Sequence, residues 1–277
     1  MDVNHSQKGD NFTGKVVVIT GGAGVLCKSL CRSLAAEGSK IAILDINYEA
    51  ANNLASEIVD TGGEAMALVC DVSRKESLNT AAQDITRSYG WVDFLINGAG
   101  GNNPQATTRA EYSFFDIPEN AMDWVLDLNL VGTMLACQVF GKLMADQKRG
   151  IILNISSMNA FRPLTRIPVY SAAKAAVSNF TQWLAVHMAQ EYSPEIRVNA
   201  IAPGFFLTDQ NRYLMVDQTT GMLSDRGQTI IDHTPLRRFG NPEDLVGTVL
   251  WLLSPASSFI TGIVVPIDGG FSAFSGV

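Results

Sequence analysis

The sequence predicts an α/β protein whose core is a doubly wound parallel sheet, and three observations support this. Seven short runs rich in β-branched residues alternate with amphipathic, helix-like stretches. The runs are apolar almost without interruption, which is typical of parallel strands covered on both faces. Of the 277 residues, 47% are apolar and 17% charged, enough apolar surface for one large core. We therefore expect about seven strands, right-handed crossovers and helices on both faces.

The elements follow one another in regular order. The predicted strands are Lys15–Thr20, Lys40–Asp45, Ala65–Cys70, Val92–Asn97, Ile151–Ser156, Arg197–Ala202 and Gly262–Ile267. Helical patterns lie near residues 25–37, 48–61, 75–89, 119–148, 170–192 and 242–253. No linker rich in Pro, Gly or Ser divides this series. Residues 1–277 are therefore predicted to form a single domain, with residues 1–12 flexible.

Two segments interrupt the alternation of strands and helices. Residues 100–118 form a polar connection with scattered aromatic residues, and residues 205–235 form a long excursion after the sixth strand. Ligands of such sheets bind beyond the carboxyl ends of the strands, where long loops are often functional. We expect residues 205–235 to be a substrate lid. Surface decoration or a subunit contact is the alternative for both segments.

Composition excludes several classes of function. The balance of 20 Lys and Arg against 27 Asp and Glu gives a net charge of −7 without a basic stripe, so we expect no nucleic-acid partner. The four cysteines form no C-x-x-C pair and the three histidines are scattered, so we expect no metal site. The polar N-terminus has no secretory h-region, and the longest apolar stretches have strand length. These features predict a cytoplasmic protein without a membrane partner.

A glycine cluster joins the first strand to the first helix. Gly21, Gly22 and Gly24 follow the strand, and Val25 and Leu26 open the helical pattern. Gly22 and Gly24 match the first two positions of G-x-G-x-x-G. Such a turn brings bare backbone amides at a helix N-terminus against a pyrophosphate. The sequence therefore predicts that these five residues bind a dinucleotide.

An acidic residue ends the second strand. Asp45 lies 21 residues after Gly24, near the spacing expected for a carboxylate that binds a ribose. A carboxylate accepts both ribose hydroxyls but repels a 2′-phosphate, and Ile46 follows where a basic residue would suit NADP. The prediction is NAD, while Lys28 leaves NADP open. The alternative is that Asp45 caps the next helix.

Four polar residues have the spacing of a catalytic group. Tyr170 and Lys174 lie at i and i+4 of a helix, Ser157 precedes Tyr170 by 13 residues, and Asn129 precedes Ser157 by 28. With the glycine turn and Asp45, this pattern resembles the short-chain dehydrogenase/reductase family, from residue 14 nearly to the end. The resemblance implies a Rossmann-type fold and an NAD(P)-dependent reaction at a CH–OH group. It implies that Tyr170 is the general acid/base, Lys174 its partner and ribose anchor, Ser157 the donor to the substrate oxygen, and Asn129 the holder of a relay water.

The implied role of Tyr170 depends on its pKa. A free tyrosine titrates near 10, so about a thousandth is phenolate at pH 7. A neighbouring ammonium favours the charged form. We expect Lys174 to lower the pKa of Tyr170 by about 2–3 units, which requires roughly 3–4 kcal/mol.

Further segments resemble cofactor contacts of the family. The glycine loop matches the family pattern at its first two glycines. It is one residue shorter than that pattern, and Leu26 or Cys27 stands at the position of the third glycine. For each of the other matching segments, taken alone, the alternative is that its residues only form a turn. The matching residues are Asn97, Gly98 and Ala99, where Gly98 replaces an Asn of the N-N-A-G run; Asp71 and Val72 beside adenine; and Pro203, Gly204 and Thr208 beside the nicotinamide amide.

Several stretches resemble the D-mannonate oxidoreductase (fructuronate reductase) branch of the family: residues 100–104, 156–170, 202–212 and 268–277. The resemblance implies interconversion of D-mannonate and D-fructuronate. A sugar acid needs a cation and amides, for which the candidates are Arg162, Arg166, Arg212, Asn102, Asn103 and Asn159. For each arginine, a solvated surface role is the alternative. A gluconate 5-dehydrogenase-like or other polyol dehydrogenase, and a non-catalytic NAD-binding scaffold, are the competing functions.

The resemblance also implies an assembly. The apolar helices near 119–148 and 170–192 resemble those that pair across two-fold axes in the family, so a homotetramer or homodimer is expected. The alternative is a monomer in which these helices merely cover the sheet.

Overall fold

The fold is organised by one parallel sheet, seen in the computed structural model, which describes residues 11–207, 212–217 and 219–276. Its strands follow the order β3-β2-β1-β4-β5-β6-β7. They are β1 (Val16–Thr20), β2 (Lys40–Asp45), β3 (Glu64–Val69), β4 (Phe94–Asn97), β5 (Gly150–Ile155), β6 (Ile196–Pro203) and β7 (Val264–Ile267). The predicted Rossmann-type fold with seven parallel strands is confirmed, and each strand boundary lies within two residues of its predicted position.

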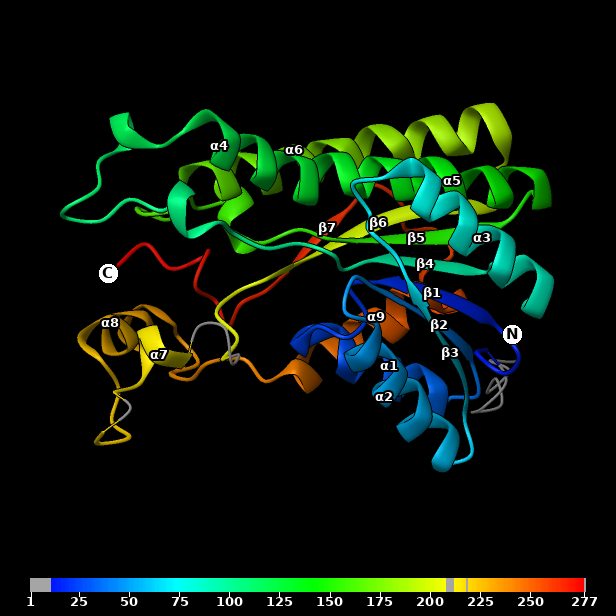
Figure 1. The fold of residues 1–277 in the computed structure, drawn as a ribbon, viewed down its shortest axis with the longest axis horizontal. Coiled ribbons are helices and arrows are strands. Elements are labelled where there is room, and N and C mark those ends of the chain that lie inside the picture. Colours follow the sequence, from blue (N-terminus) through cyan, green and yellow to red (C-terminus); the bar gives the residue numbers. More distant parts are fainter. Residues whose placement is uncertain (1–10, 208–211, 218, 277) are drawn as a thin grey trace, which may run out of the picture.

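Helices cover both faces of the sheet (Figure 1). One face packs against α1 (Val25–Ala36), α2 (Tyr48–Asp60) and α9 (Val246–Leu253). The other carries α3 (Lys75–Tyr89), α5 (Gly132–Gln147) and α6 (Pro168–His187), and α4 (Glu119–Leu126) packs against α6 on the same side. Two short helices, α7 (Arg212–Met215) and α8 (Asp225–His233), lie beyond the carboxyl ends of the strands within the predicted lid.

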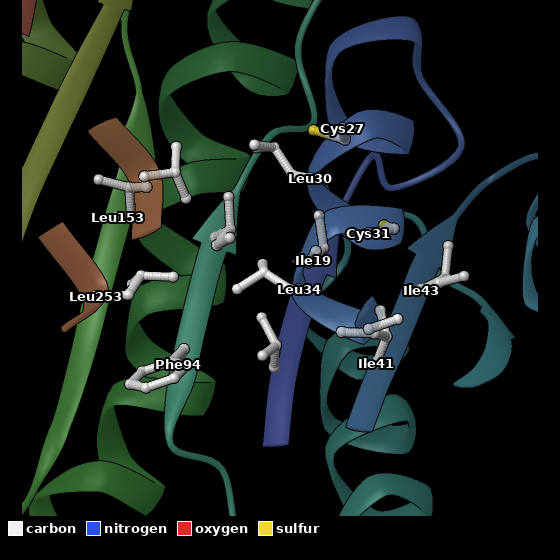
Figure 2. Packing of buried hydrophobic residues seen from close by; sticks show 14 of the residues in the cluster. Ile19, Cys27, Leu30, Cys31, Leu34, Ile41, Ile43, Phe94, Leu153 and Leu253 are labelled. Carbon is white, nitrogen blue, oxygen red and sulfur yellow. The ribbon is translucent and has the colours of Figure 1, made fainter. Parts of the chain in front are cut away.

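Alternating side chains of the central strands build the two halves of the core. Figure 2 shows Leu30 and Leu34 of α1 lying against Ile19 of β1 and its neighbours on β2 and β4. Leu30 and Leu34 are 1% exposed and Ile19 is fully buried. Burying one such side chain stabilises the fold by about 1.5–3 kcal/mol. The sheet therefore gives a rigid platform for the loops at its edge.

The predicted helix over residues 119–148 is not uniform. A wider π-helical turn, Asp127–Val131, separates α4 from α5, and a similar turn, Met188–Tyr192, follows α6. By length and composition the run Glu119–Gln147 is also apolar enough to cross a membrane. The expectation that apolar stretches have only strand length was therefore wrong. Half of the apolar window is buried within the protein, as in a helix that covers a sheet.

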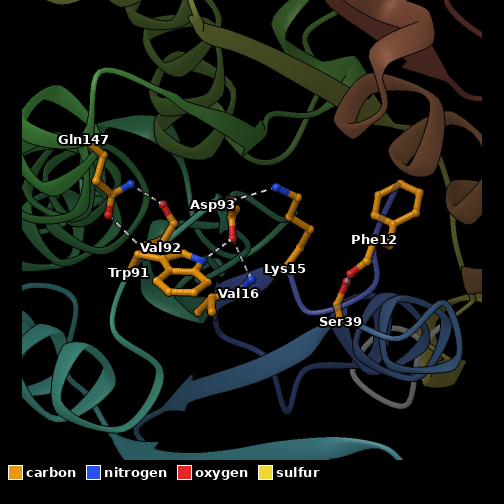
Figure 3. A network of polar contacts seen from close by, with 8 residues as sticks. All are labelled: Phe12, Lys15, Val16, Ser39, Trp91, Val92, Asp93 and Gln147. Atoms are coloured by element: carbon orange, nitrogen blue, oxygen red, sulfur yellow. Dashed lines mark hydrogen bonds and ion pairs between the residues drawn. The ribbon is translucent and has the colours of Figure 1, made fainter. Parts of the chain in front are cut away.

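A polar network closes the amino end of the sheet, far from the strands' carboxyl ends (Figure 3). The Asp93 carboxylate accepts hydrogen bonds from Lys15 Nζ (3.2 Å), the Val16 amide (3.0 Å) and Trp91 Nε1 (2.8 Å). Nearby, Phe12 is buried and packs edge-on against Phe94. The predicted flexibility of residues 1–12 therefore does not extend to Phe12, because its ring belongs to the core; residues 1–10 lie outside the described residues.

Candidate active site

The candidate site lies where four strands end side by side. The segments that follow β1, β4, β5 and β6 carry the glycine cluster, residues 98–100, Ser157 and Gly204. Because all strands are parallel, these segments meet at one edge of the sheet. The order β1-β4 marks the point where the winding of the sheet reverses, which is the usual binding crevice of such folds.

The glycine turn is shaped by close backbone packing. Gly21 has φ +61°, and a Cβ there would lie 2.7 Å from the Ala99 Cα. A Cβ on Gly22 would lie 2.8 Å from Ile43 Cγ2. Gly24 precedes α1, and no side chain caps the N-terminus of the helix that Val25 opens. The bare helix N-terminus beside a glycine turn fits the pyrophosphate of a dinucleotide.

Two departures from the family pattern compensate each other in space. Cys27 stands where the third glycine is expected, and Gly98 stands where the family pattern has an asparagine. A Cβ on Gly98 would lie 2.2 Å from Cys27 Sγ and 2.9 Å from the Thr20 carbonyl oxygen. The missing side chain at Gly98 therefore makes room for the thiol, so the shortened loop keeps its packing against β4.

This packing gives a first prediction. We expect Gly98→Ala to lower the free energy of unfolding by about 1–3 kcal/mol, because the new methyl group overpacks a rigid turn. Cys27→Ala in the same chain should recover part of the loss, because one of the two conflicts disappears. Urea unfolding of the single and double variants measures this coupling. Additive losses would contradict the proposed pairing of the two positions.

Asp45 links the end of β2 to the glycine turn. Its Oδ2 accepts a 3.1 Å hydrogen bond from the Ala23 amide, and its Oδ1 accepts one of 2.9 Å from the Asn47 amide. The cap of α2 is Asn47, whose side chain accepts from the Ala50 amide. The alternative that Asp45 caps this helix is therefore wrong. The carboxylate stands beside the turn, where a ribose would lie.

The other predicted cofactor residues that the structure describes lie at the same carboxyl edge of the sheet, but their hydrogen bonds and packing differ. Asp71 accepts from the amide and hydroxyl of Ser73, and Val72 is buried. Asn97 Nδ2 donates to Asn154 Oδ1 at 2.9 Å, deep in the core, so that side chain belongs to a buried network. The site edge also includes Ala99, Pro203 and Gly204, while Thr208 lies outside the described residues.

Tyr170, Lys174 and Ser157 come together at the carboxyl end of β5. α6 begins at Pro168, so Tyr170 and Lys174 lie one turn apart near its start. The Lys174 ammonium is buried, lies 5.6 Å from the centre of the Tyr170 ring and donates a 2.8 Å hydrogen bond to the Ile155 carbonyl oxygen. Ser157 is buried at the start of the 3₁₀ turn Met158–Ala160. The structure thus brings the three predicted residues into one group.

The electrostatics differ from the prediction. Burial raises the pKa of Tyr170 to about 12, and a hydrogen bond with Ser157 opposes this rise. Burial also lowers the pKa of Lys174 to about 8. The expectation that Lys174 lowers the pKa of Tyr170 was wrong, because desolvation of the phenol outweighs the influences that lower its pKa.

The pKa of Lys174 gives a second prediction. Between pH 8 and 10.5 the unfolded chain keeps the Lys174 proton that the folded chain has lost, so this group makes the free energy of unfolding rise with pH. We expect wild-type protein to gain about 2–3 kcal/mol relative to Lys174→Met between pH 7.5 and 10. Urea unfolding of both proteins at these pH values measures the difference. A constant difference would show that Lys174 titrates at its ordinary value.

Asn129 is fully buried in the π-helical turn Asp127–Val131. Its Nδ2 donates to the carbonyl oxygens of Gly101 (2.7 Å) and Val125 (2.8 Å), and its Oδ1 accepts from the Gly101 amide (3.2 Å). A Cβ on Gly100 would lie 2.8 Å from Asn129 Oδ1 and 3.2 Å from Lys174 Nζ. Asn129 therefore fixes the backbone beside Lys174, with both amide donors in use. Its role towards a relay water stays a prediction.

The predicted substrate residues are brought together only in part. Asn102 donates to Thr107 Oγ1 at 2.7 Å, while its buried Oδ1 has no partner among the described residues. Asn159 is buried directly after Ser157. Arg162 Nε donates a 3.2 Å hydrogen bond to the Ser272 carbonyl oxygen, so this atom binds the C-terminal tail. Arg212 is exposed at the start of α7.

One basic residue near the predicted substrate residues, Arg226, is not among those predicted from the sequence. Arg226 of α8 lies near Arg166, which is four residues before Tyr170, and the charge of Arg166 contributes to lowering the pKa of Arg226. The sequence pattern around Arg226 carries no motif, so only the folded arrangement could reveal it.

The C-terminal tail packs against the segment that follows β6 and against α8. The Phe271 ring lies 5.1 Å from the Phe205 ring and 5.2 Å from the His233 ring of α8. Phe206, in contrast, is buried in the core. Of the aromatic pair at 205–206, Phe205 therefore contacts the tail, and Phe206 belongs to the core.

The chain is similar to known oxidoreductases along almost its whole length. A family model described as enoyl-(acyl carrier protein) reductase matches residues 21–272. An uncharacterized oxidoreductase, UxuB, of Bacillus subtilis is 49% identical over 277 residues, covering 97% of this chain and 98% of the relative. The 5-keto-D-gluconate 5-reductase of Escherichia coli is 31% identical, covering 94% of this chain and 96% of the relative.

One solved structure is similar in both fold and sequence. It is a protein of Haemophilus influenza, provisionally named a D-mannonate oxidoreductase and crystallised with bound NAD. It superposes with a TM-score of 0.91 at 47% identity, covering 96% of this chain and 98% of that chain.

Proposed function

Because the chain belongs to the short-chain dehydrogenase/reductase family, an oxidoreductase family acting on alcohol and ketone groups, we propose that it interconverts D-mannonate and D-fructuronate with NAD(H). The observation that carries the chemistry is the meeting of Tyr170, Lys174 and Ser157 at the carboxyl edge of the sheet. The name of the Haemophilus influenza protein supports the substrate.

The residues at the glycine turn fit a dinucleotide without a 2′-phosphate. Asp45 holds the turn through the Ala23 amide, and Ile46 is 73% exposed where a basic side chain would suit a phosphate. The uncapped N-terminus of α1 would hold the pyrophosphate, and Asp45 the ribose hydroxyls. A bound nicotinamide would accept the hydride from the substrate carbon or return it.

Tyr170 of α6 donates the proton to the substrate oxygen, and Ser157, after β5, and Lys174 assist it. With a pKa of about 12, the Tyr170 phenol is protonated at neutral pH, so in reduction it donates its proton to the ketone oxygen. Ser157 donates a hydrogen bond to the same oxygen and stabilises the developing charge. The buried Lys174 ammonium lies over the Tyr170 ring and stabilises the phenolate left behind. In oxidation the same atoms act in reverse, with the phenolate as base.

A substrate panel tests this proposal. Initial rates with NAD are measured for D-mannonate, D-gluconate and D-mannitol, which differ in configuration or in the carboxylate. We expect the largest kcat/KM for D-mannonate and production of the 5-keto acid. Preference for D-mannitol would overturn the sugar-acid assignment.

A gluconate 5-dehydrogenase-like activity is the second candidate, favoured by the similarity to 5-keto-D-gluconate 5-reductase. A larger kcat/KM for D-gluconate in the same panel would select it. A non-catalytic NAD-binding scaffold is disfavoured, because Asn129, Ser157, Tyr170 and Lys174 are all present and assembled.

For assembly we propose a homotetramer or homodimer in the cytoplasm. The outer faces of α5 and α6 expose apolar side chains, among them Trp183 and Val186, and the described cysteines are all free. Light scattering tests the assembly: a single species near 29.9 kDa would overturn it.

A further inference from the structure

Arg226 has an unusual environment for a cation near the surface. It is the second residue of α8, in the predicted lid, and its Nε is buried without a hydrogen-bond partner among the described residues. An unsatisfied buried donor costs about 1–3 kcal/mol, and more when the group is charged. Such a cost is uncommon in native proteins and needs an explanation.

The charge of a second arginine acts on Arg226. Burial lowers the pKa of the Arg226 guanidinium, and the positive charge of Arg166 lowers it further. Arg166 comes from a different part of the fold, the loop before α6, where its carbonyl oxygen accepts a 2.8 Å hydrogen bond from the Thr108 amide. The charges of two arginines from separate elements thus interact, and this like-charge interaction is unfavourable.

No acid in the described part of the chain forms an ion pair with either arginine. Two arginines that follow the predicted lid are paired: Arg237 with Asp232, and Arg238 with Asp244. Within the described part of the chain, Arg166 and Arg226 therefore have no acidic partner.

We propose that Arg226 and Arg166 bind the carboxylate of the sugar acid between the predicted lid (residues 205–235) and α6. This contact would determine the preference of the enzyme for sugar acids over neutral polyols. This inference rests on the proposed function. A guanidinium fork matches a carboxylate in two hydrogen bonds, and an anion would both satisfy Arg226 Nε and offset the repulsion between the two cations. Because Arg166 precedes Tyr170 by only four residues, the bound carboxylate would lie near the reacting end of α6.

The test compares an acid with its neutral analogue in matched variants. Steady-state oxidation of D-mannonate and D-mannitol with NAD is measured for wild type, Arg226→Gln, Arg226→Lys, Arg166→Gln and the control Arg237→Gln. We expect Arg226→Gln and Arg166→Gln to raise KM for D-mannonate about 10- to 100-fold, while KM for D-mannitol changes less than about threefold. Arg226→Lys should recover part of the loss, and Arg237→Gln should behave as wild type.

The outcomes separate this inference from the proposed function. If wild type prefers D-mannitol, the sugar-acid function fails. If wild type prefers D-mannonate but Arg226→Gln and Arg166→Gln keep the wild-type ratio of KM values, the arginine pair is overturned while the function stands. If Arg226→Gln does not fold, Arg226→Lys and Arg166→Gln decide by the same ratio. NADH binding of each variant, expected to be unchanged, distinguishes loss of the carboxylate contact from general damage.

Discussion

Tyr170→Phe is expected to lower kcat for D-mannonate oxidation by about 10²- to 10⁴-fold, the usual contribution of a positioned acid or base. The substitution removes one oxygen atom and keeps the ring that lies 5.6 Å from Lys174 Nζ. The reaction in both directions loses the group that carries the proton. Stopped-flow measurement of NADH formation at pH 7 to 10 gives the rates of both proteins.

Binding measurements provide the control for this variant. We expect the affinity of Tyr170→Phe for NADH to stay within about threefold of wild type, because Asp45 and the glycine turn are untouched. Ser157→Ala provides a comparison, with a smaller loss expected because it removes a hydrogen bond rather than the proton donor. Activity of Tyr170→Phe close to wild type would show that another group transfers the proton.

The second large effect concerns the choice of cofactor. We expect Asp45→Asn combined with Ile46→Arg to change the ratio of kcat/KM for NADP to that for NAD by about 10²- to 10⁴-fold in favour of NADP. The carboxylate that would repel a 2′-phosphate is removed, and an exposed guanidinium that pairs with it is added. Ile46 is 73% exposed, so the arginine requires no repacking of the core.

The single variant Asp45→Asn separates the loss of repulsion between Asp45 and the 2′-phosphate from the attraction that an arginine at position 46 would add. It keeps an oxygen that accepts from the Ala23 or Asn47 amide, so the turn should stay folded. This variant should show a smaller change than the double variant, because it gains no pairing with the phosphate. Initial rates with both cofactors measure the ratios. An unchanged ratio in the double variant would show that Asp45 does not face the ribose.

The fold was predictable because the pattern of apolar runs depends on local rules. Parallel strands buried on both faces read as continuous apolar runs, so Val16–Thr20 and Lys40–Asp45 were located almost to the residue. The π-helical turn at Asp127–Val131 was not found, because inserting one wider turn leaves the apolar periodicity of a long helix nearly intact.

The catalytic group was predictable from spacing, since Tyr170 and Lys174 share one helix face. The pKa of Tyr170 was not, because it depends on burial by elements distant in sequence. The complementarity of Cys27 and Gly98 joins positions 71 residues apart, and Arg226 belongs to a segment without a motif. Both features depend on tertiary contacts, which a local sequence pattern does not predict.

A crystal structure of the Tyr170→Phe variant with NAD and D-mannonate tests most directly whether Ser157 and the residue at position 170 act on the substrate oxygen. We expect the C5 hydroxyl to lie within hydrogen-bond distance of Ser157 Oγ, beside the ring at position 170 and the nicotinamide. We also expect the carboxylate to contact Arg166 and Arg226. A sugar acid bound with its C5 hydroxyl away from Ser157 would show that this side-chain group does not act on the substrate oxygen.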